Sequence, residues 1–288
     1  MKKTIISCVL FLTAVTAFSQ TTMKTAAEAK LSASDLAVKI ADRILATTTY
    51  EFKNTKTGKT YKSVKNLPLD MNVKVACKYN NWHYTNGVTH IALMELADKT
   101  GAKKYDDYVF KNMNFVFNEG NLDFFKKQYD QAMKDEGWYG VRKLSWHMIF
   151  RGKRLDDNGP MGASLIDLQM KHPNNSFLNY INETAEHLNY GEPRLADGTI
   201  ARIWPHENTI WADDAFMAIS FLARMAKMTG DMNYINDAAN QVIKYHKYLW
   251  CPEKRILYHC YHTDTDEHGV AHWSRANGWV FMASTLSR

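Results

Sequence analysis

The sequence predicts an all-α protein, an α/α toroid in which apolar helices line the inside of a ring and more polar helices cover the outside. Three observations predict this fold class: apolar residues recur mostly at helical spacing, few segments alternate as strands do, and a long pattern repeats along the chain. The segment 211–231 is apolar around most of its circumference, as in a helix buried on several sides. One hairpin cannot bury such helices, whereas a ring of hairpins can.

The first nineteen residues are typical of a secretory signal peptide. Lys2 and Lys3 precede the apolar run 5–18, and Ala17-Phe18-Ser19 resembles a cleavage site before Gln20. The run is too short and wrongly flanked for a membrane span, so export and a protein outside the membrane are expected. A polar leader, 20–33, then precedes the helical domain, 34–288.

Composition gives few further constraints. The net charge is +6, and the basic residues are scattered, so nucleic-acid binding is not expected. Cys77, Cys251 and Cys260 follow the signal segment; Cys251 and Cys260 are close enough in sequence to pair, although the odd total leaves at least one thiol free or bonded between chains. No cofactor is expected. The sequence lacks a G-x-S-x-G elbow and a Gly-rich phosphate loop.

Four histidines crowd one segment, but their spacing is not that of a zinc site. A loop of surface histidines is the preferred interpretation, and no metal is expected. They are His259, His262, His268 and His272.

The helical domain begins with an amphipathic helix. Ser34 is a plausible N-cap, and Leu36, Ile40 and Ile44 share one face.

The repeat defines the helices that follow. Segments 82–105 and 211–234 both run from a Trp to an A-x-x-T-G-x-x-x-Y ending, without a gap. A third copy starts at Trp273, and a looser copy places Asn158-Gly159 where Asn86-Gly87 stand in the first. Each copy predicts a loop, an apolar helix, a tight Thr-Gly turn and a second helix. The third Trp motif is followed closely by TLSR, so an incomplete ring lacking its C-terminal hairpins is expected.

Residues just before or at the start of each apolar helix should share one end of the ring. Aromatic rings that stack on sugars and carboxyl groups that transfer protons are typical of carbohydrate chemistry. The alternative for each residue alone is helix capping or core packing. The candidates are Tyr84, Asn86, Asp156, Asp157, Trp211, Asp213, Asp214, Arg275 and Trp279.

Several motifs, in order, resemble a known family. WHYTNGV, LDDNGPMGASLIDL, LADGTIAR, WADDAFMA, ILYHCYHTD and WSRANGWV are similar to landmark segments of glycoside hydrolase family 105, the unsaturated rhamnogalacturonyl hydrolases, with family 88 unsaturated glucuronyl hydrolases as near relatives. The resemblance runs from about residue 34 to the end. It implies an (α/α)6 barrel of six hairpins, and a reaction without metal or cofactor. The implied substrate is a lyase-generated pectic oligosaccharide with a 4,5-unsaturated uronic acid at its non-reducing end, and a periplasmic location is expected.

The resemblance also implies roles for individual residues. Asp213 resembles the general acid/base that protonates C4 of the vinyl ether, after which water adds at C5 and the hemiketal opens. Burial beside Trp211 and a second nearby carboxylate would favour the protonated form of Asp213 that this step needs. Asp157 is the preferred second carboxylate, with Asp156 the alternative, because the Asp-Asp pair is ambiguous.

The remaining implied residues are substrate contacts. Trp211 and Trp279 resemble stacking walls, while Tyr84, His259 and Arg275 resemble polar contacts, and Arg275 could hold the uronate carboxylate. His206 is a tentative counterpart of a histidine that family members often carry ahead of the WADD-type motif. The insert 126–154 fits an excursion at the mouth, either rich in substrate contacts or only a surface ornament.

Two other function classes remain as alternatives. In a catalytically silent carbohydrate-binding protein, the same aromatic residues would bind sugar while the acids cap helices. A sugar epimerase or isomerase would need paired histidines at the inner-helix starts, which the sequence does not show.

Overall fold

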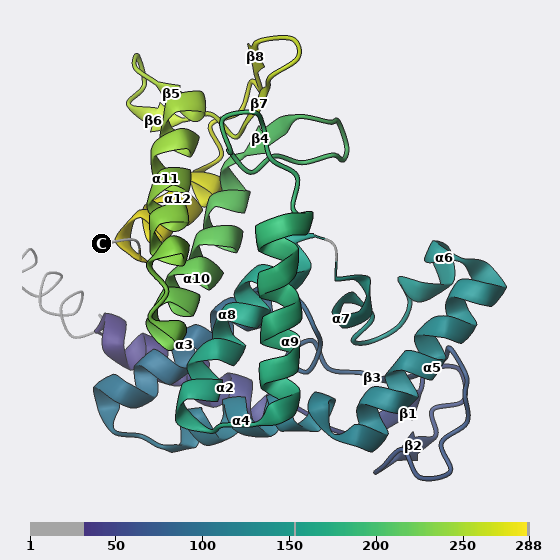
Figure 1. Ribbon diagram of the computed structural model, residues 1–288. Helices are drawn as coiled ribbons and strands as arrows, with labels where there is room; N and C mark the ends of the chain where they lie inside the picture. The colour runs from purple at the N-terminus through teal and green to yellow at the C-terminus, as the bar shows by residue number, and fades with distance from the viewer. Residues whose placement is uncertain (1–31, 153, 287–288) are drawn as a thin grey trace, which may run out of the picture. The chain divides into compact units, whose positions relative to one another are not determined.

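The computed structural model describes residues 32–152 and 154–286 (Figure 1). The predicted signal peptide and the leader up to residue 31 lie outside the described residues. The chain divides into two compact units, one ending at Ala46 and the other beginning at Thr47.

The described part of the first unit consists of Ser32 and helix α2 (Ala33–Thr47) as far as Ala46. The Ser32 hydroxyl accepts a hydrogen bond from the Asp35 amide at 3.1 Å, so Ser32 caps the helix rather than the predicted Ser34. On the expected apolar face only Ile44 is buried, while Leu36 and Ile40 are exposed.

Four helices of the second unit correspond to the four sequence repeats. They are α3 (Tyr84–Thr100), α8 (Leu155–Lys171), α10 (Ala212–Thr229) and α12 (Ser274–Leu286), and they contact one another in that order. The second helices of the hairpins, α4 (Lys104–Phe117), α9 (Asn175–Glu186) and α11 (Met232–Leu249), each contact the helix that precedes them (Figure 1). The predicted all-α hairpin fold is confirmed.

Burial separates the inner helices from the outer ones. In α10, 12 of the 18 residues are buried, against 4 of 18 in α11. A helix buried over two thirds of its length must have neighbours on several sides, which explains why the segment beginning at Ala212 is apolar around most of its circumference.

The Thr-Gly turns end the inner helices as the repeat predicts. Gly101 after α3 has φ 68°, and Gly230 after α10 has φ 74°. This left-handed conformation suits glycine, because a Cβ would clash with the following backbone.

The repeated Asn-Gly pair has two structural roles. The side-chain amide of the Asn donates to a carbonyl of the preceding connecting segment in three copies: Asn86 to Asn81 at 2.8 Å, Asn158 to Gly152 at 2.8 Å, and Asn277 to Leu257 at 3.0 Å. The asparagine therefore fixes the loop that leads into each of these inner helices.

The glycine of the pair lets neighbouring inner helices approach closely. A Cβ on Gly87 would lie 2.3 Å from the Pro160 carbonyl carbon of α8, and one on Gly159 would lie 2.0 Å from the Met217 oxygen of α10. No side chain fits at these two positions.

Short strands, which the sequence did not reveal, connect the helices. Strands β2 (Thr60–Tyr61), β1 (Phe52–Asn54) and β3 (Val73–Val75) form an antiparallel sheet in that order. A second sheet joins β4 (Thr209–Trp211), β7 (Cys260–His262) and β8 (Glu267–His268), and β5 (Trp250–Cys251) pairs with β6 (Ile256–Leu257). Strands of two or three residues are too short to show an alternating pattern.

The insert predicted over 126–154 is mostly helical. It begins within α5 (Glu119–Glu136) and continues through α6 (Trp138–Val141) and α7 (Met148–Arg151). Ala132, Val141 and Leu144 form a buried apolar cluster, and the Gln128 amide donates to the Val73 carbonyl of β3 at 2.8 Å. The insert therefore packs against the sheet formed by β2, β1 and β3. The π-helical turn η1 (His187–Gly191) extends α9.

Cys77, Cys251 and Cys260 are free thiols, so the possible Cys251–Cys260 bond is not formed. In the part of the chain that the structure describes, no helix combines the length and apolar character of a membrane span.

Candidate active site

The repeat register places four side chains at equivalent positions. Three inner helices align on the Asn-Gly pair, and α10, which has Ala215-Phe216 in its place, aligns through the match of 211–234 with 82–105. The residue two places before this position lies in the first turn of each inner helix. The four residues are Tyr84, Asp156, Asp213 and Arg275. The following position holds Asp157 in α8 and Asp214 in α10, both buried.

Asp213 is paired with a histidine. Its Oδ2 lies 2.9 Å from Nε2 of His259. Strand pairing brings the two together, because Trp211 lies opposite Cys260 and the Ala212 amide donates to the His259 carbonyl at 2.9 Å. The Trp211 ring meets the His259 ring edge to face, with centroids 4.9 Å apart. Since Trp211 occupies the N-cap position of α10, Asp213 is not the N-cap.

Asp214 lies in a buried ion pair with Arg202. The carboxylate is 2% exposed and accepts two hydrogen bonds from the guanidinium of Arg202, both 2.6 Å long. Burial is the largest single influence and disfavours the cation, but the charge and hydrogen bonds of Asp214, together with the charge of Asp156, outweigh it and raise the pKa of Arg202. The guanidinium also lies over the Trp211 ring, 4.7 Å from its centroid. Arg202 therefore contacts both Asp214 and the Trp211 ring.

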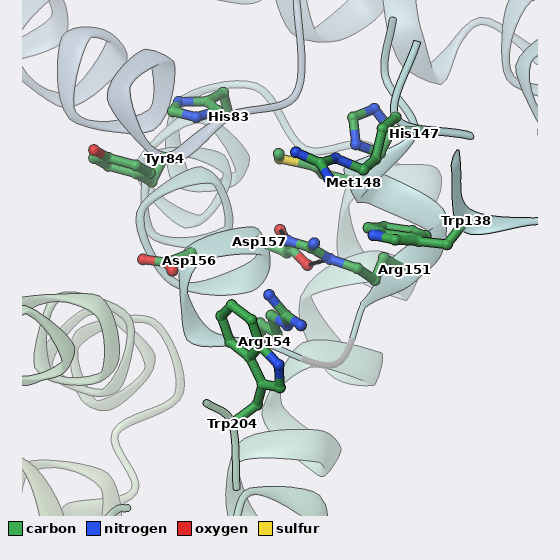
Figure 2. A pocket seen from close by; sticks show the side chains of 11 residues that line it. His83, Tyr84, Trp138, His147, Met148, Arg151, Arg154, Asp156, Asp157 and Trp204 are labelled. Atoms are coloured by element: carbon green, nitrogen blue, oxygen red, sulfur yellow. Dashed lines mark hydrogen bonds and ion pairs between the residues drawn. The ribbon is translucent and has the colours of Figure 1, made fainter. Parts of the chain in front are cut away.

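Asp157 of α8 also lies in a buried ion pair with an arginine. Its side chain is fully buried and forms a bidentate ion pair with Arg151 of α7. Burial raises its pKa, while Arg151 opposes this shift. Figure 2 shows the Asp157 carboxylate directed at Arg151, away from Asp156. Both carboxylate oxygens of Asp157 accept hydrogen bonds from Arg151, which leaves little capacity to bind a substrate.

Asp156 points the other way and has no close cationic partner among the described residues. Its nearest ion-pair contact is Nη2 of Arg202 at 3.9 Å. Burial, followed by the negative charge of Asp214, raises its pKa to about 6, with further contributions from Asp157 and Asp213 that Arg202 partly offsets. Asp156 therefore belongs to one electrostatic group with the acids of α10.

Two adjoining cavities open beside Asp156. The smaller, of about 340 Å³, lies between the start of α3 and the insert (Figure 2). The larger, of about 680 Å³, reaches Asp214, Arg202 and the η1 turn. Both volumes lie in the range of small-molecule sites. The residues that line both cavities are Trp138, Arg151, Arg154, Asp156 and Trp204.

Of the predicted substrate contacts, Tyr84 lines the smaller cavity, whereas Trp279 and Arg275 line neither of the two. Trp279 stacks on Phe216 at 5.0 Å between ring centroids, and Tyr84 meets it edge to face at 6.5 Å. Arg275 lies 3.9 Å over the ring of Trp273.

Trp273 also connects Arg275 to the histidine of the site, since its ring lies 4.9 Å from that of His259. His206 is exposed and faces His262 at 5.8 Å between centroids, so its ring is directed at another histidine rather than at the acids.

Several residues of the site escaped the sequence interpretation. Arg202 lies in the LADGTIAR segment, but nothing local indicates its pairing with an acid twelve residues later. Arg151, Arg154 and Trp204 carry no motif of their own. The signal that favours Asp156 over Asp157 was available, because both Asp156 and Asp213 align with Tyr84 of the first repeat copy.

The described residues hold no group of three His, Cys, Asp or Glu side chains placed to bind a metal ion. Acids, arginines and tryptophans at the starts of inner helices are typical of α/α proteins that act on carbohydrates.

Comparison with known proteins identifies the family. The model of Glycosyl Hydrolase Family 88 matches residues 55–286, and the chain belongs to this family. This confirms the resemblance to families 105 and 88 drawn from the motifs.

The individual relatives share a low sequence identity with this chain. The unsaturated rhamnogalacturonyl hydrolase YesR of Bacillus subtilis (strain 168) is 26% identical over 174 residues, which cover 57% of this chain and 46% of that protein. A family 105 glycoside hydrolase of C. acetobutylicum ATCC 824 superposes with a TM-score of 0.55 at 22% identity, covering 77% of this chain and 55% of the other.

A possible family 105 member from Klebsiella pneumoniae gives a TM-score of 0.56 at 15% identity, with 88% and 57% covered. These two structures support the fold alone. The chain spans about half the length of the relatives it matches.

Proposed function

We propose that this site removes a 4,5-unsaturated uronic acid from the non-reducing end of lyase-generated rhamnogalacturonan oligosaccharides by hydrating the vinyl ether. The observation that carries the proposal is the pair of carboxyl groups at equivalent positions of α8 and α10, Asp156 and Asp213, of which Asp213 contacts His259, whose ring meets that of Trp211. Membership of Glycosyl Hydrolase Family 88 supports the reaction class.

Asp213 supplies the proton in this proposal. Protonation of C4 leaves positive charge shared between C5 and the ring oxygen, and water then adds at C5 while the Asp213 carboxylate takes up a proton from that water. The hemiketal opens, and the resulting hemiacetal at C1 collapses to an aldehyde and releases the leaving sugar. His259, 2.9 Å away, holds the Asp213 carboxyl in a fixed orientation.

Asp156 takes the role of the second carboxyl, in place of the Asp157 preferred from the sequence. Asp157 is fully buried and held by Arg151, whereas Asp156 lines both cavities. A carboxylate at Asp156 would stabilise the cation that develops at C5.

Turnover of an unsaturated rhamnogalacturonan disaccharide tests the proposal. The purified chain should abolish the ultraviolet absorbance of the conjugated uronate and release free rhamnose, while Asp213→Asn should not. Asp107→Asn, an exposed acid of α4, is the matched control. A folded wild-type chain that binds the disaccharide and leaves its absorbance unchanged would point instead to the catalytically silent sugar-binding alternative.

We also propose that the protein acts in the periplasm after export. The charged and apolar segments at the N-terminus support this location. Mass spectrometry of the protein from fractionated cells tests it: a mature N-terminus at Gln20 in the periplasmic fraction is expected, and an intact Met1 in the cytoplasm contradicts the proposal.

A further inference from the structure

The insert between α4 and α8 forms much of one wall of the smaller cavity, where the sequence allowed either substrate contacts or ornament. Figure 2 shows its side chains facing Tyr84 and Asp156 across the open space. The lining residues it supplies are Trp138, Arg142, His147, Met148, Arg151 and Arg154.

Two of the three arginines in this lining have no ion-pair partner among the described residues. Arg151 is engaged by Asp157. Arg142 and Arg154 are exposed and lie on the cavity without a neighbouring carboxylate in ion-pair contact. Unpaired arginines that converge on a cavity are suited to an anionic ligand.

The other titratable groups of the lining do not cancel this charge. Burial lowers the pKa of both His83 and His147, so their rings are neutral near pH 7. Asp156 lies at the far edge of the cavity, on the side of Tyr84 (Figure 2). The wall formed by the insert is therefore positive.

Arg154 is presented in a geometry that suits recognition of an anion. Its guanidinium lies over the Trp204 ring, 4.7 Å from the centroid. Stacking on an indole face holds the planar group in place and leaves its in-plane N–H donors available for a bidentate contact with a carboxylate or sulfate. Trp204 is 60% exposed, which leaves apolar ring surface beside the charge for a sugar to cover.

The position of this wall relative to the reaction determines which sugar it meets. This step rests on the proposed function. An unsaturated uronate at the non-reducing end has one glycosidic neighbour, attached through C1. If C4 and C5 of the uronate lie at Asp213 and Asp156, a further sugar of the substrate that occupies the smaller cavity must belong to the leaving part.

We propose that Arg154, supported by Arg142 and the Trp204 ring, forms a leaving-group subsite for an acidic sugar. The preferred substrates are unsaturated oligosaccharides with a second anionic group in the leaving part, either the carboxylate of an internal uronate or a sulfate ester. A disaccharide with a neutral leaving sugar fills only the reaction site.

Three substrates test this subsite: the rhamnogalacturonan disaccharide, the corresponding tetrasaccharide with an internal uronate, and an unsaturated disaccharide sulfated on its leaving sugar. The measured quantity is the ratio of kcat/KM for each acidic substrate to that for the neutral disaccharide. The variants are Arg154→Gln and Arg154→Lys, with Arg255→Gln on the exposed β5–β6 turn as the matched control. Binding of the same sugars to the Asp213→Asn protein is measured by calorimetry.

Wild type should prefer at least one acidic substrate by roughly tenfold to a hundredfold, as for a charge-assisted contact. Arg154→Gln should bring this ratio close to one, Arg154→Lys should restore it in part, and the control should keep it. The acidic substrate that shows the preference identifies the carboxylate or the sulfate as the ligand.

A ratio near one in the wild type overturns the subsite. So does an Arg154→Gln variant that loses all three substrates equally, which would mean that Arg154 holds the unsaturated uronate itself. If no substrate is consumed, the proposed function fails, and the calorimetric preference for the acidic sugars still decides whether the subsite exists.

Discussion

The first turns of α8 and α10 carry the same pair of acids in the same register, and they differ in what surrounds the first acid. In both, the second acid is buried and neutralised by an arginine, Arg151 for Asp157 and Arg202 for Asp214. The first acid of α10, however, contacts His259, whereas Asp156 of α8 has only a distant arginine.

The repeat determines where each of these side chains lies, whereas the connecting segments determine what surrounds it. The four inner helices place equivalent side chains at one rim, because each hairpin copies the same backbone. The partners come from non-repeated segments: Arg151 from the insert, Arg202 from the stretch before β4, and His259 from the loop before β7. One helical pattern thereby produces two carboxyl groups with different environments, which is what acid/base chemistry requires.

The largest expected effect separates the two acids of α10. Asp213→Asn should lower kcat by about 10²- to 10⁴-fold, the usual contribution of a proton-transferring group, and leave the melting temperature near that of the wild type. Asp214→Asn should instead reduce stability, because Arg202 loses its partner. Absorbance loss and a circular dichroism melt on both variants check this; equal activity losses at equal stability would contradict the division of roles.

The next effect in size is the loss of stability when the buried Arg202–Asp214 ion pair is broken. Arg202→Leu leaves the Asp214 charge buried and unpaired, and it should cost about 3–5 kcal/mol in the free energy of unfolding. Adding Asp214→Leu should recover most of that loss, because a buried apolar pair needs no counter-charge. Urea unfolding of both variants measures the difference. A double variant no more stable than the single one would mean that Arg202 acts through its contact with Trp211.

A variant of His259 tests whether this residue accounts for the difference between the acids of α10 and α8. His259→Gln keeps a hydrogen-bond donor near Asp213 but changes its geometry, so we expect kcat to fall roughly tenfold with a smaller change in KM. His262→Gln, on the same strand pair, is the matched control. Steady-state kinetics on the disaccharide check this expectation, and an unchanged kcat would show that Asp213 needs no orienting partner.

The sequence predicted the helices and the rim because both follow local rules. A 3.6-residue apolar period, Thr-Gly turns and repeated Asn-Gly pairs are each visible within a few residues. The arginines were not predictable in this way, since Arg151 and Arg202 meet their acids only after loops fold, and an unpaired arginine in sequence resembles any surface residue. The short strands β4 and β7 were missed because three residues are too few to show an alternating pattern, although their pairing is what brings His259 to Asp213.

The smallest expected effect concerns the acid without a close partner. Because the pKa of Asp156 is raised from 3.8 to about 6, the folded protein binds a proton more tightly than the unfolded chain does. The cost of holding the carboxylate is therefore absent below pH 3.8, develops as the pH rises from 3.8 to about 6, and is complete above pH 6. Asp156→Asn removes this cost and should raise the melting temperature at pH 7, on the order of 2 °C given the partial exposure of the group.

The difference between wild type and Asp156→Asn should shrink toward pH 4, where both side chains are neutral. Asp157→Asn supplies the contrast within α8, because it removes the partner of Arg151 and should destabilise the protein at pH 7. Melting curves of the three proteins at several pH values decide between the two acids. An Asp156→Asn protein that is less stable than the wild type at pH 7 would mean that its carboxylate stabilises the fold, and the proposal that α8 holds a charge for function rather than for stability would be wrong.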